Sequence, residues 1–237
     1  MIDSLSIVFP AYNENRRLKD CFSNIEKFNQ IASIKKVEYI FVDDGSADLT
    51  SSKIRKFIKD KDSNKYKLIK LKNNIGKGGA LAKGVINAKY NWVLTLDTDI
   101  SVSLLEIERW IKNNYIKNYS IYFGSRNLKK SKLEFRLHRK IIGIFFILIC
   151  RLLLNIKIHD TQCGFKLYKK KVAKKIFYRM KEKRFAHDIE IVMLAKLFKI
   201  QVIELPVTWI HKSDSKLNLI KDSFNMLISL LKIKNRY

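Results

Sequence analysis

The sequence predicts an α/β fold in which helices cover both faces of a doubly wound, mainly parallel sheet. Two observations lead to this prediction. Short apolar segments alternate with segments of helical periodicity through residues 1–125, which is the βαβ rhythm of parallel sheets. In addition, two apolar segments end in carboxylates, at Asp43-Asp44 and at Asp97-Thr98-Asp99. Open α/β folds bind ligands at the carboxyl ends of their strands, so these acidic ends mark a candidate site.

The elements of this first part follow from local patterns in the sequence. Apolar runs predict strands at 5–9, 37–43, 66–71, 92–97 and 120–123. Helices are expected between them, at 15–30, 49–59, 78–89 and 104–114. The first helix carries Leu18, Phe22, Ile25 and Phe28 at helical spacing, and Asp48 is placed to cap the second.

The second part of the chain is less regular. An apolar helix is expected at 141–154, and a polar stretch follows at 160–166. Helices at 170–180 and 188–199, a strand at 201–205 and a tail helix at 217–233 complete the prediction. Because no flexible linker divides the chain, we expect one domain, 1–237, with halves 1–125 and 126–237.

The formal net charge of +26 on 237 residues narrows the choice of partners. Nucleic acid, an anionic membrane surface and a phosphate-rich substrate would each favour such a charge, and a lysine-rich compositional drift would also produce it. No helix-turn-helix, zinc-finger or aromatic RNA-binding signature is present, and the paired acidic strand ends oppose nucleic acid. A basic nucleic-acid-binding protein is therefore the remote alternative.

Cysteine usage and hydropathy indicate the compartment. Cys21, Cys150 and Cys163 lack the CxxC spacing of zinc sites, and their odd number favours a reducing compartment. The chain begins with a strand and shows no signal peptide, so we expect a cytoplasmic protein. Segment 141–154 is too short to span a bilayer. Its basic flanks fit an amphipathic helix in a membrane interface, as do the lysines of the tail helix, and a buried core helix is the alternative.

Asp97 and Asp99 are the candidate metal ligands. Alternate side chains on an extended segment point to the same side, so we expect both carboxylates to face one ligand. A hard divalent cation with oxygen ligands would relieve their repulsion and bind phosphates in turn. Taken alone, the same spacing also fits a solvated turn.

Five motifs, taken in order, resemble family 2 glycosyltransferases of the GT-A fold. They are Val-Phe-Pro-Ala-Tyr-Asn-Glu at 8–14, Val-Asp-Asp-Gly-Ser at 42–46, Asn-Ile-Gly-Lys-Gly-Gly-Ala at 74–80, Leu-Asp-Thr-Asp at 96–99 and Asp-Thr-Gln-Cys-Gly-Phe-Lys-Leu-Tyr at 160–168. The third and fifth are similar to the branch that acts on polyprenyl phosphates, the dolichyl-phosphate glucosyltransferases above all. Members of that branch carry a membrane anchor, which we expect this chain to lack.

The resemblance implies roles for residues on the donor side. Pro10, Tyr12 and Glu14 would frame the uridine of a UDP-sugar, Asp43 would accept a hydrogen bond from the uracil, and Asp44 would support the same loop. A simple strand-to-helix turn is the alternative for residues 10–14.

The same resemblance implies how the donor diphosphate is held. Asp97 and Asp99 would bind Mg²⁺ or Mn²⁺ against it, and Lys77 would add positive charge. The glycine turn around Lys77 could offer N–H groups to a phosphate, although a tight turn into a packed helix explains the glycines equally well.

On the acceptor side, the resemblance places a phosphate on Arg126 and Arg139, with Arg136 as the alternative to Arg139. Asp160 and Gln162 would border the acceptor, and Asp160 would orient groups rather than abstract a proton, because a phosphate monoester is already largely ionised. The alternative for the arginines is a solvated surface position.

Two further acceptor-side motifs match less fully. Asp188 and Glu190 resemble paired acidic residues near the site, and favourable acidic placement in a first helical turn is their alternative. Lys216 resembles the last residue of a Gly-Ser-Lys motif, but Asp214 stands where relatives have glycine.

The expected function is therefore an inverting, metal-dependent glycosyltransferase. It would move a sugar, glucose by resemblance, from a UDP-sugar to a polyprenyl (dolichyl or undecaprenyl) phosphate at the cytosolic face of a membrane, to which it would bind peripherally. A family 2 transferase with a soluble or polysaccharide acceptor is the enzyme alternative.

Overall fold

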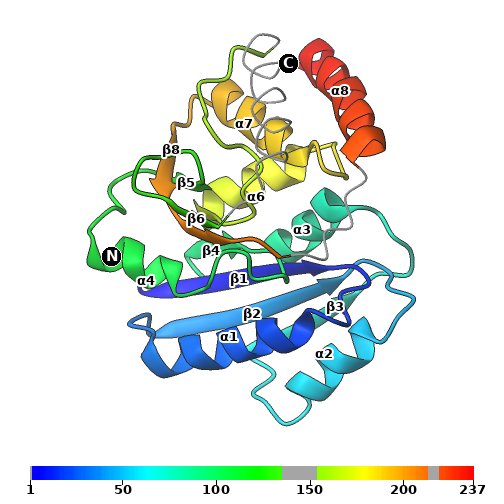
Figure 1. Ribbon diagram of the computed structural model, residues 1–237, viewed down its shortest axis with the longest axis vertical. Helices are drawn as coiled ribbons and strands as arrows, with labels where there is room; N and C mark the ends of the chain where they lie inside the picture. The colour runs from blue at the N-terminus through cyan, green and yellow to red at the C-terminus, as the bar shows by residue number, and fades with distance from the viewer. Residues whose placement is uncertain (1, 135–153, 213–218) are drawn as a thin grey trace.

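The computed structural model describes residues 2–134, 154–212 and 219–237, and it confirms the α/β class. A seven-stranded sheet with the order β3-β2-β1-β4-β7-β5-β8 forms the centre of the molecule (Figure 1). Its strands are β1 (Ser4–Ala11), β2 (Lys36–Asp43), β3 (Tyr66–Lys70), β4 (Trp92–Thr95), β5 (Ile121–Ser125), β7 (Lys166–Lys169) and β8 (Val202–Pro206). A second, two-stranded sheet pairs β6 (Lys132–Glu134) with β9 (Thr208–Ile210).

Parallel pairing brings the carboxyl ends of the first strands to one edge. β1 pairs with β2 from Ser4↔Lys36 to Ala11↔Asp43, and it pairs with β4 on its other side. The loops that follow β1, β2, β3 and β4 therefore leave the sheet together, which is where the sequence predicted the site.

Helices cover both faces of the sheet, as predicted. On one face lie α1 (Leu18–Ile31), α2 (Thr50–Ile58) and α4 (Glu106–Lys112). On the other lie α3 (Lys77–Ile86), α6 (Lys170–Arg179), α7 (His187–Leu197) and α8 (Leu219–Arg236), as Figure 1 shows. Asp48 lies one residue before the N-cap of α2, which is Leu49 and not Asp48 as predicted, although Asp48 Oδ1 still accepts the N–H of Thr50, the first residue of the helix, at 2.9 Å.

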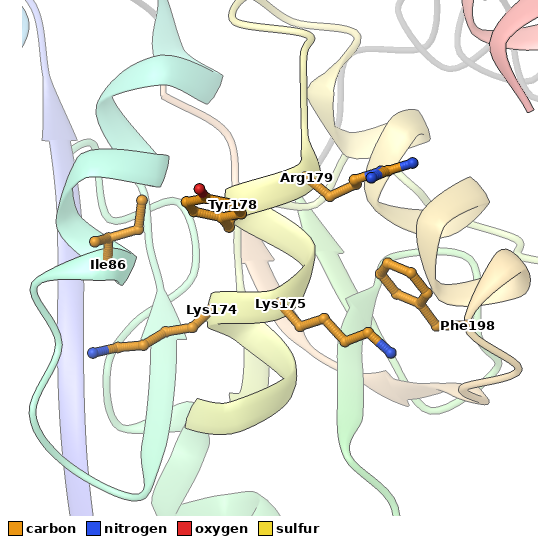
Figure 2. Close-up of a pocket in the computed structure, with 6 residues that line it drawn as sticks. All are labelled: Ile86, Lys174, Lys175, Tyr178, Arg179 and Phe198. Carbon is orange, nitrogen blue, oxygen red and sulfur yellow. The ribbon is translucent and has the colours of Figure 1, made fainter.

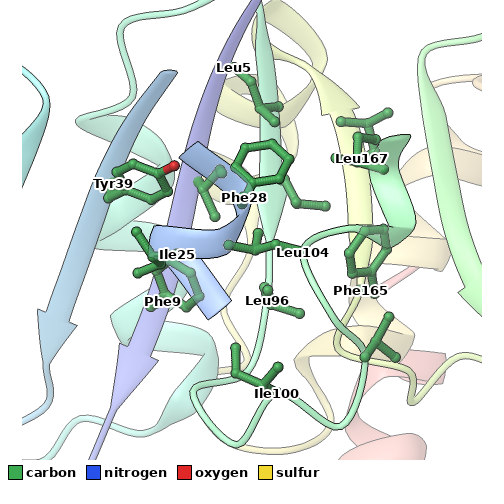
Figure 3. Close-up of a cluster of buried hydrophobic side chains, with 14 of the residues drawn as sticks. Leu5, Phe9, Ile25, Phe28, Tyr39, Leu96, Ile100, Leu104, Phe165 and Leu167 are labelled. Carbon is green, nitrogen blue, oxygen red and sulfur yellow. The ribbon is translucent and has the colours of Figure 1, made fainter. Parts of the chain in front are cut away.

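The core divides according to the alternation of side chains along β1. Leu5, Ile7 and Phe9 face the α1 side, while Val8 faces the α3 side. Figure 3 shows part of the first cluster, to which α1 contributes Ile25 and Phe28 and β1 contributes Leu5 and Phe9. Burying both faces of the central strands explains why they read as continuous apolar runs.

Three of the strands that the structure describes were not predicted from the sequence. β7 begins inside the stretch predicted to be polar, and it enters the centre of the sheet antiparallel to both β4 and β5. Its four residues are too few to show a strand pattern. β6 and β9, with three residues each, were missed for the same reason.

One boundary matters for the site. The strand predicted at 92–97 ends at Thr95, and the N–H of Ile100 donates to the carbonyl of Asp97 at 3.2 Å. Asp97 and Asp99 therefore lie in a turn and not in an extended strand. The prediction that they share one side because side chains alternate along a strand was wrong. Ile100 has a φ of +52°, a value that is rare for a β-branched residue.

The proposed interfacial helices are only partly described. The predicted helix 141–154 lies outside the described residues except for its last residue, Leu154. α8 buries Leu230 and Ile233 against the core, while Leu227, Ile228 and Leu231 are exposed. Among the described helices, none combines the length and apolarity needed to cross a bilayer.

Candidate functional site

Two loops at the carboxyl edge of the sheet contain residues predicted to bind the donor; we call loops 10–14 and 43–46 the donor wall. The loop after β1 rests on the loop after β2, where the N–H of Asn13 donates to Ser46 Oγ at 2.9 Å and that of Glu14 donates to Thr50 Oγ1 at 2.8 Å. Asn13 has a φ of +54°, which an asparagine tolerates and which turns the chain sharply after Tyr12. This places Pro10, Tyr12 and Glu14 beside the acidic end of β2, as the sequence suggested.

The two aspartates at the end of β2 have different roles. Asp43 is fully buried, and its Oδ1 accepts the N–H of Ser46 at 3.0 Å. Its Oδ2 is buried without a hydrogen-bond partner among the described residues, which leaves an acceptor for a ligand donor. Asp44 instead accepts the N–H groups of Ile75 and Gly76, at 2.8 and 2.9 Å. Burial raises the pKa of Asp44 despite these hydrogen bonds.

The glycine turn at 76–79 brings Lys77 to the acidic pair. Gly76 has a φ of +97°, so a side chain there would strain the backbone. Lys77 opens α3, and its Nζ lies 2.7 Å from Asp97 Oδ1. Burial lowers the pKa of Lys77, but the carboxylates of Asp97, Asp188 and Asp99 outweigh burial and raise it, so the side chain stays charged.

Asp97 and Asp99 lie at the edge of the sheet with partly exposed side chains. Asp99 Oδ1 accepts the N–H of Ser101 at 2.9 Å, which fixes its turn. Asp97 packs against Gly164, where an added Cβ would come within 2.3 Å of Asp97 Oδ2. The fifth motif therefore supplies a glycine that makes room for the carboxylate, and the paired oxygens are the donor set that Mg²⁺ and Mn²⁺ prefer.

Arg126 and Asp160 form a two-pronged ion pair. Arg126 Nε donates to Asp160 Oδ2 at 2.7 Å, and Nη2 donates to Oδ1 at 2.9 Å. Burial raises the pKa of Asp160, but the charge and hydrogen bonds of Arg126 lower it by more, so the pKa lies below its usual range. The N–H of Gln162 also donates to Asp160, at 3.1 Å. Asp160 is thus fully buried and orients Arg126, whose guanidinium lies 5.8 Å from the ring of Trp209.

Asp188 lies on the other side of Lys77 and pairs with a buried lysine. Lys166 Nζ is 2.6 Å from Asp188 Oδ1, and both side chains are almost fully buried. Burial raises the pKa of Asp188, but His187, Lys166 and Lys77 together hold it well below its usual range. Lys166, Asp188, Lys77 and Asp97 thereby form a line of alternating charge that ends at the acidic pair.

Several site residues escaped sequence reasoning. Lys166 and Trp209 were not singled out, nor was Glu204, whose Oε1 accepts the N–H of Asp160 at 2.9 Å. The position of Lys166 between the apolar residues Phe165 and Leu167 was an available signal. Arg139, Arg136 and Lys216, predicted for the acceptor side, lie outside the described residues.

A separate hollow of about 630 Å³ lies on the α3 side of the molecule. Figure 2 shows Lys174, Lys175 and Tyr178 of α6 between Ile86 of α3 and Phe198. None of the predicted site residues that the structure describes lines it, so this hollow is separate from those residues at the edge of the sheet.

Comparison with known proteins identifies the family of the chain. The sequence model of glycosyl transferase family 2 matches residues 6–177. A dolichyl-phosphate beta-glucosyltransferase from Dictyostelium discoideum is 34% identical over 98% of this chain and 74% of its own. The Homo sapiens protein of the same name is 32% identical over 98% of this chain and 75% of its own.

Solved structures show the same fold. Glucosyl-3-phosphoglycerate synthase from Mycobacterium tuberculosis, in complex with Mn²⁺, UDP and phosphoglyceric acid, superposes with a TM-score of 0.71 at 15% identity, covering 98% of this chain and 78% of that one. A second complex of that synthase, with UDP, gives a TM-score of 0.68 at 14% identity and covers 98% and 80%. The chain is therefore a member of glycosyl transferase family 2, with a GT-A fold and a similarity to dolichyl-phosphate beta-glucosyltransferases along nearly its whole length.

Proposed function

We propose that the protein transfers glucose from UDP-glucose to a polyprenyl phosphate, with inversion at the anomeric carbon. The observation that carries the proposal is the meeting of a donor wall, an acidic pair and a forked arginine at one edge of the sheet. The relatives named for glucose transfer to dolichyl phosphate support the choice of sugar and acceptor.

On the donor side, the proposal gives the buried Oδ2 of Asp43 the N–H of the uracil as its partner. Asp97 and Asp99 would hold Mg²⁺ or Mn²⁺, which would offset the negative charge that develops on departing UDP. No three acidic, histidine or cysteine side chains gather as a metal cluster in the described ranges, so diphosphate and water would supply the other ligands. Lys77 would then exchange Asp97 for a phosphate oxygen.

On the acceptor side, an oxygen of the lipid phosphate would attack the anomeric carbon while the bond from that carbon to the β-phosphate oxygen of UDP breaks. The second pKa of a phosphate monoester is about 6, so the attacking oxygen needs no base at neutral pH. Asp160 accordingly serves to hold Arg126, and Arg126 to orient the phosphate.

Membrane binding is the second half of the proposal. Leu227, Ile228 and Leu231 lie on one side of α8 and are 36%, 38% and 49% exposed. An apolar stripe on a helix with lysines fits the interface of an anionic bilayer. In flotation with anionic vesicles, Leu231→Glu should reduce binding, whereas Lys234→Gln, an exposed change on the same helix, should have a smaller effect.

The test of the activity uses vesicles that contain a polyprenyl phosphate and a panel of labelled UDP- and GDP-sugars. Label from UDP-glucose should appear in the organic phase, and an Asp99→Asn protein should transfer almost none. Label that enters only a water-soluble phosphate acceptor, such as phosphoglycerate, would establish the soluble-acceptor alternative instead.

A further inference from the structure

Glu190 is a buried carboxylate that the proposed reaction does not use. It lies two residues after Asp188 on α7, and successive helical positions two apart point in nearly opposite directions. Asp188 therefore faces Lys166, while Glu190 is fully buried on the other side of α7. Its Oε2 accepts the N–H groups of Lys181 and Glu182, at 2.9 and 2.5 Å.

The other oxygen of Glu190 connects to the C-terminal helix. Oε1 accepts Nη1 of Arg236 at 2.7 Å and the hydroxyl of Tyr237 at 2.9 Å. Arg236 also reaches Glu182, at 3.8 Å. Burial, together with the carboxylate of Glu190, raises the pKa of Tyr237 to about 12. One side chain thus joins the end of α8 to the segment at 181–186.

That segment covers the turn that opens α3. The N–H of Gly79 donates to the carbonyl of Lys183 at 3.0 Å. A Cβ added at Gly76 would come within 2.4 Å of the Lys183 carbonyl, and one at Gly78 within 2.8 Å of the Glu182 carbonyl. The segment and the glycine turn therefore lie in direct contact, immediately beside Lys77.

We propose that Glu190 is a positioning residue for the donor: it clamps segment 181–186 onto the glycine turn of α3 and ties both to α8. The identity of the donor rests on the proposed function, whereas the clamp rests on the contacts above. α8 also carries the exposed apolar stripe of Leu227, Ile228 and Leu231. Through the clamp, the position of the glycine turn at 76–79 therefore depends on the position of α8.

Limited trypsin digestion tests the clamp without any substrate. Lys181, Lys183 and Arg184 are exposed cleavage points in the segment, and cleavage there reports its opening. Glu190→Gln replaces one acceptor oxygen with a donor, and Arg236→Gln removes the cation. Each should raise the cleavage rate at these three bonds by about tenfold or more, the scale of losing hydrogen bonds to a charged group.

The donor role is tested by binding UDP alone in calorimetry. Both variants should weaken UDP binding by about fivefold or more, and the KM for UDP-glucose should rise while kcat changes by less than about twofold. Arg236→Lys keeps the charge and should recover part of the affinity. Lys234→Gln removes the same charge from an exposed position on α8 and should behave as wild type.

The outcomes separate the clamp from the proposed function. Unchanged cleavage at 181–184 in folded Glu190→Gln and Arg236→Gln proteins would overturn the clamp. Faster cleavage with unaltered UDP affinity would overturn its donor role. A wild-type protein that binds no UDP would count against the proposed donor, while the digestion would still decide whether the clamp exists.

Discussion

The proposed donor and acceptor sides of the site differ in how deeply their ion pairs are buried. On the donor side, side-chain oxygens of Ser46, Thr50 and Asp44 accept backbone N–H groups from neighbouring loops, and the ion pair of Lys77 with Asp97 is partly exposed. On the acceptor side, Asp160 is fully buried against Arg126, and Lys166 and Asp188 are almost fully buried together. Breaking a buried ion pair leaves an unpaired charge in the interior, which costs more than breaking an exposed pair. The two sides should therefore respond differently to conservative substitutions.

The largest effect is expected where the two sides meet, at the acidic pair. Asp97→Asn or Asp99→Asn removes a charge that would offset the diphosphate, so turnover should fall by about 10²-fold or more. Turnover and thermal melting are measured together, with Asp60→Asn at an exposed position as control. Near-normal turnover by a folded Asp99→Asn protein, or full activity in excess chelator, would contradict the metal assignment.

Gly164→Ala tests the same point without changing any charge. Its Cβ would overlap Asp97 Oδ2, at 2.3 Å, and displace the carboxylate, so turnover should fall by about tenfold or more. The matched control is Gly84→Ala, whose Cβ would approach Val8 Cγ1 to the same 2.3 Å inside the core. The Gly84→Ala protein should lose thermal stability and not turnover. If Gly164→Ala likewise lowered the melting temperature and left turnover unchanged, a role for Gly164 at the site would be refuted.

On the acceptor side, Arg126→Lys should raise the apparent KM for the lipid phosphate by about tenfold. A lysine cannot reproduce the two-pronged contact with Asp160, so the cation would no longer be oriented toward the phosphate. Calorimetry with UDP should show little change. If donor binding weakened as much as acceptor binding, the division into two sides would be wrong.

The smallest effect is a change in how stability depends on pH. The pKa of Asp160 lies below its usual range, so this group stabilises the fold above about pH 4 and loses that contribution as pH falls through the lowered pKa. Asp160→Asn should cost about 1.5–3 kcal/mol at pH 7. Urea unfolding between pH 7 and pH 2 should show that the free energy of unfolding falls less steeply with decreasing pH in this variant than in the wild type. The same pH dependence in both proteins would contradict the assignment.

Sequence reasoning reached the donor side far more completely than the acceptor side. The strands before Asp43 and Asp97 are buried on both faces, so the sequence shows them as continuous apolar runs. Because these strands are parallel, the loops that follow them lie at the same edge of the sheet. Lys166 and Glu204 lie in short strands whose burial depends on distant segments. Local sequence patterns do not show which distant residues come into contact. The contacts of Lys166 with Asp188 and of Glu204 with Asp160 could therefore not be predicted from them.

β7 also affects the order in which the protein can fold during synthesis. It lies between β4 and β5 although it follows both in the sequence, so neither strand gains its inner neighbour until residue 169 has left the ribosome. Until then the growing chain presents one unpaired edge of β4 and both edges of β5, whose other neighbour, β8, is synthesised later still, and such apolar edges are prone to aggregate. A fragment ending at Ser125 would keep these edges permanently, so the donor half is not expected to be soluble when expressed alone.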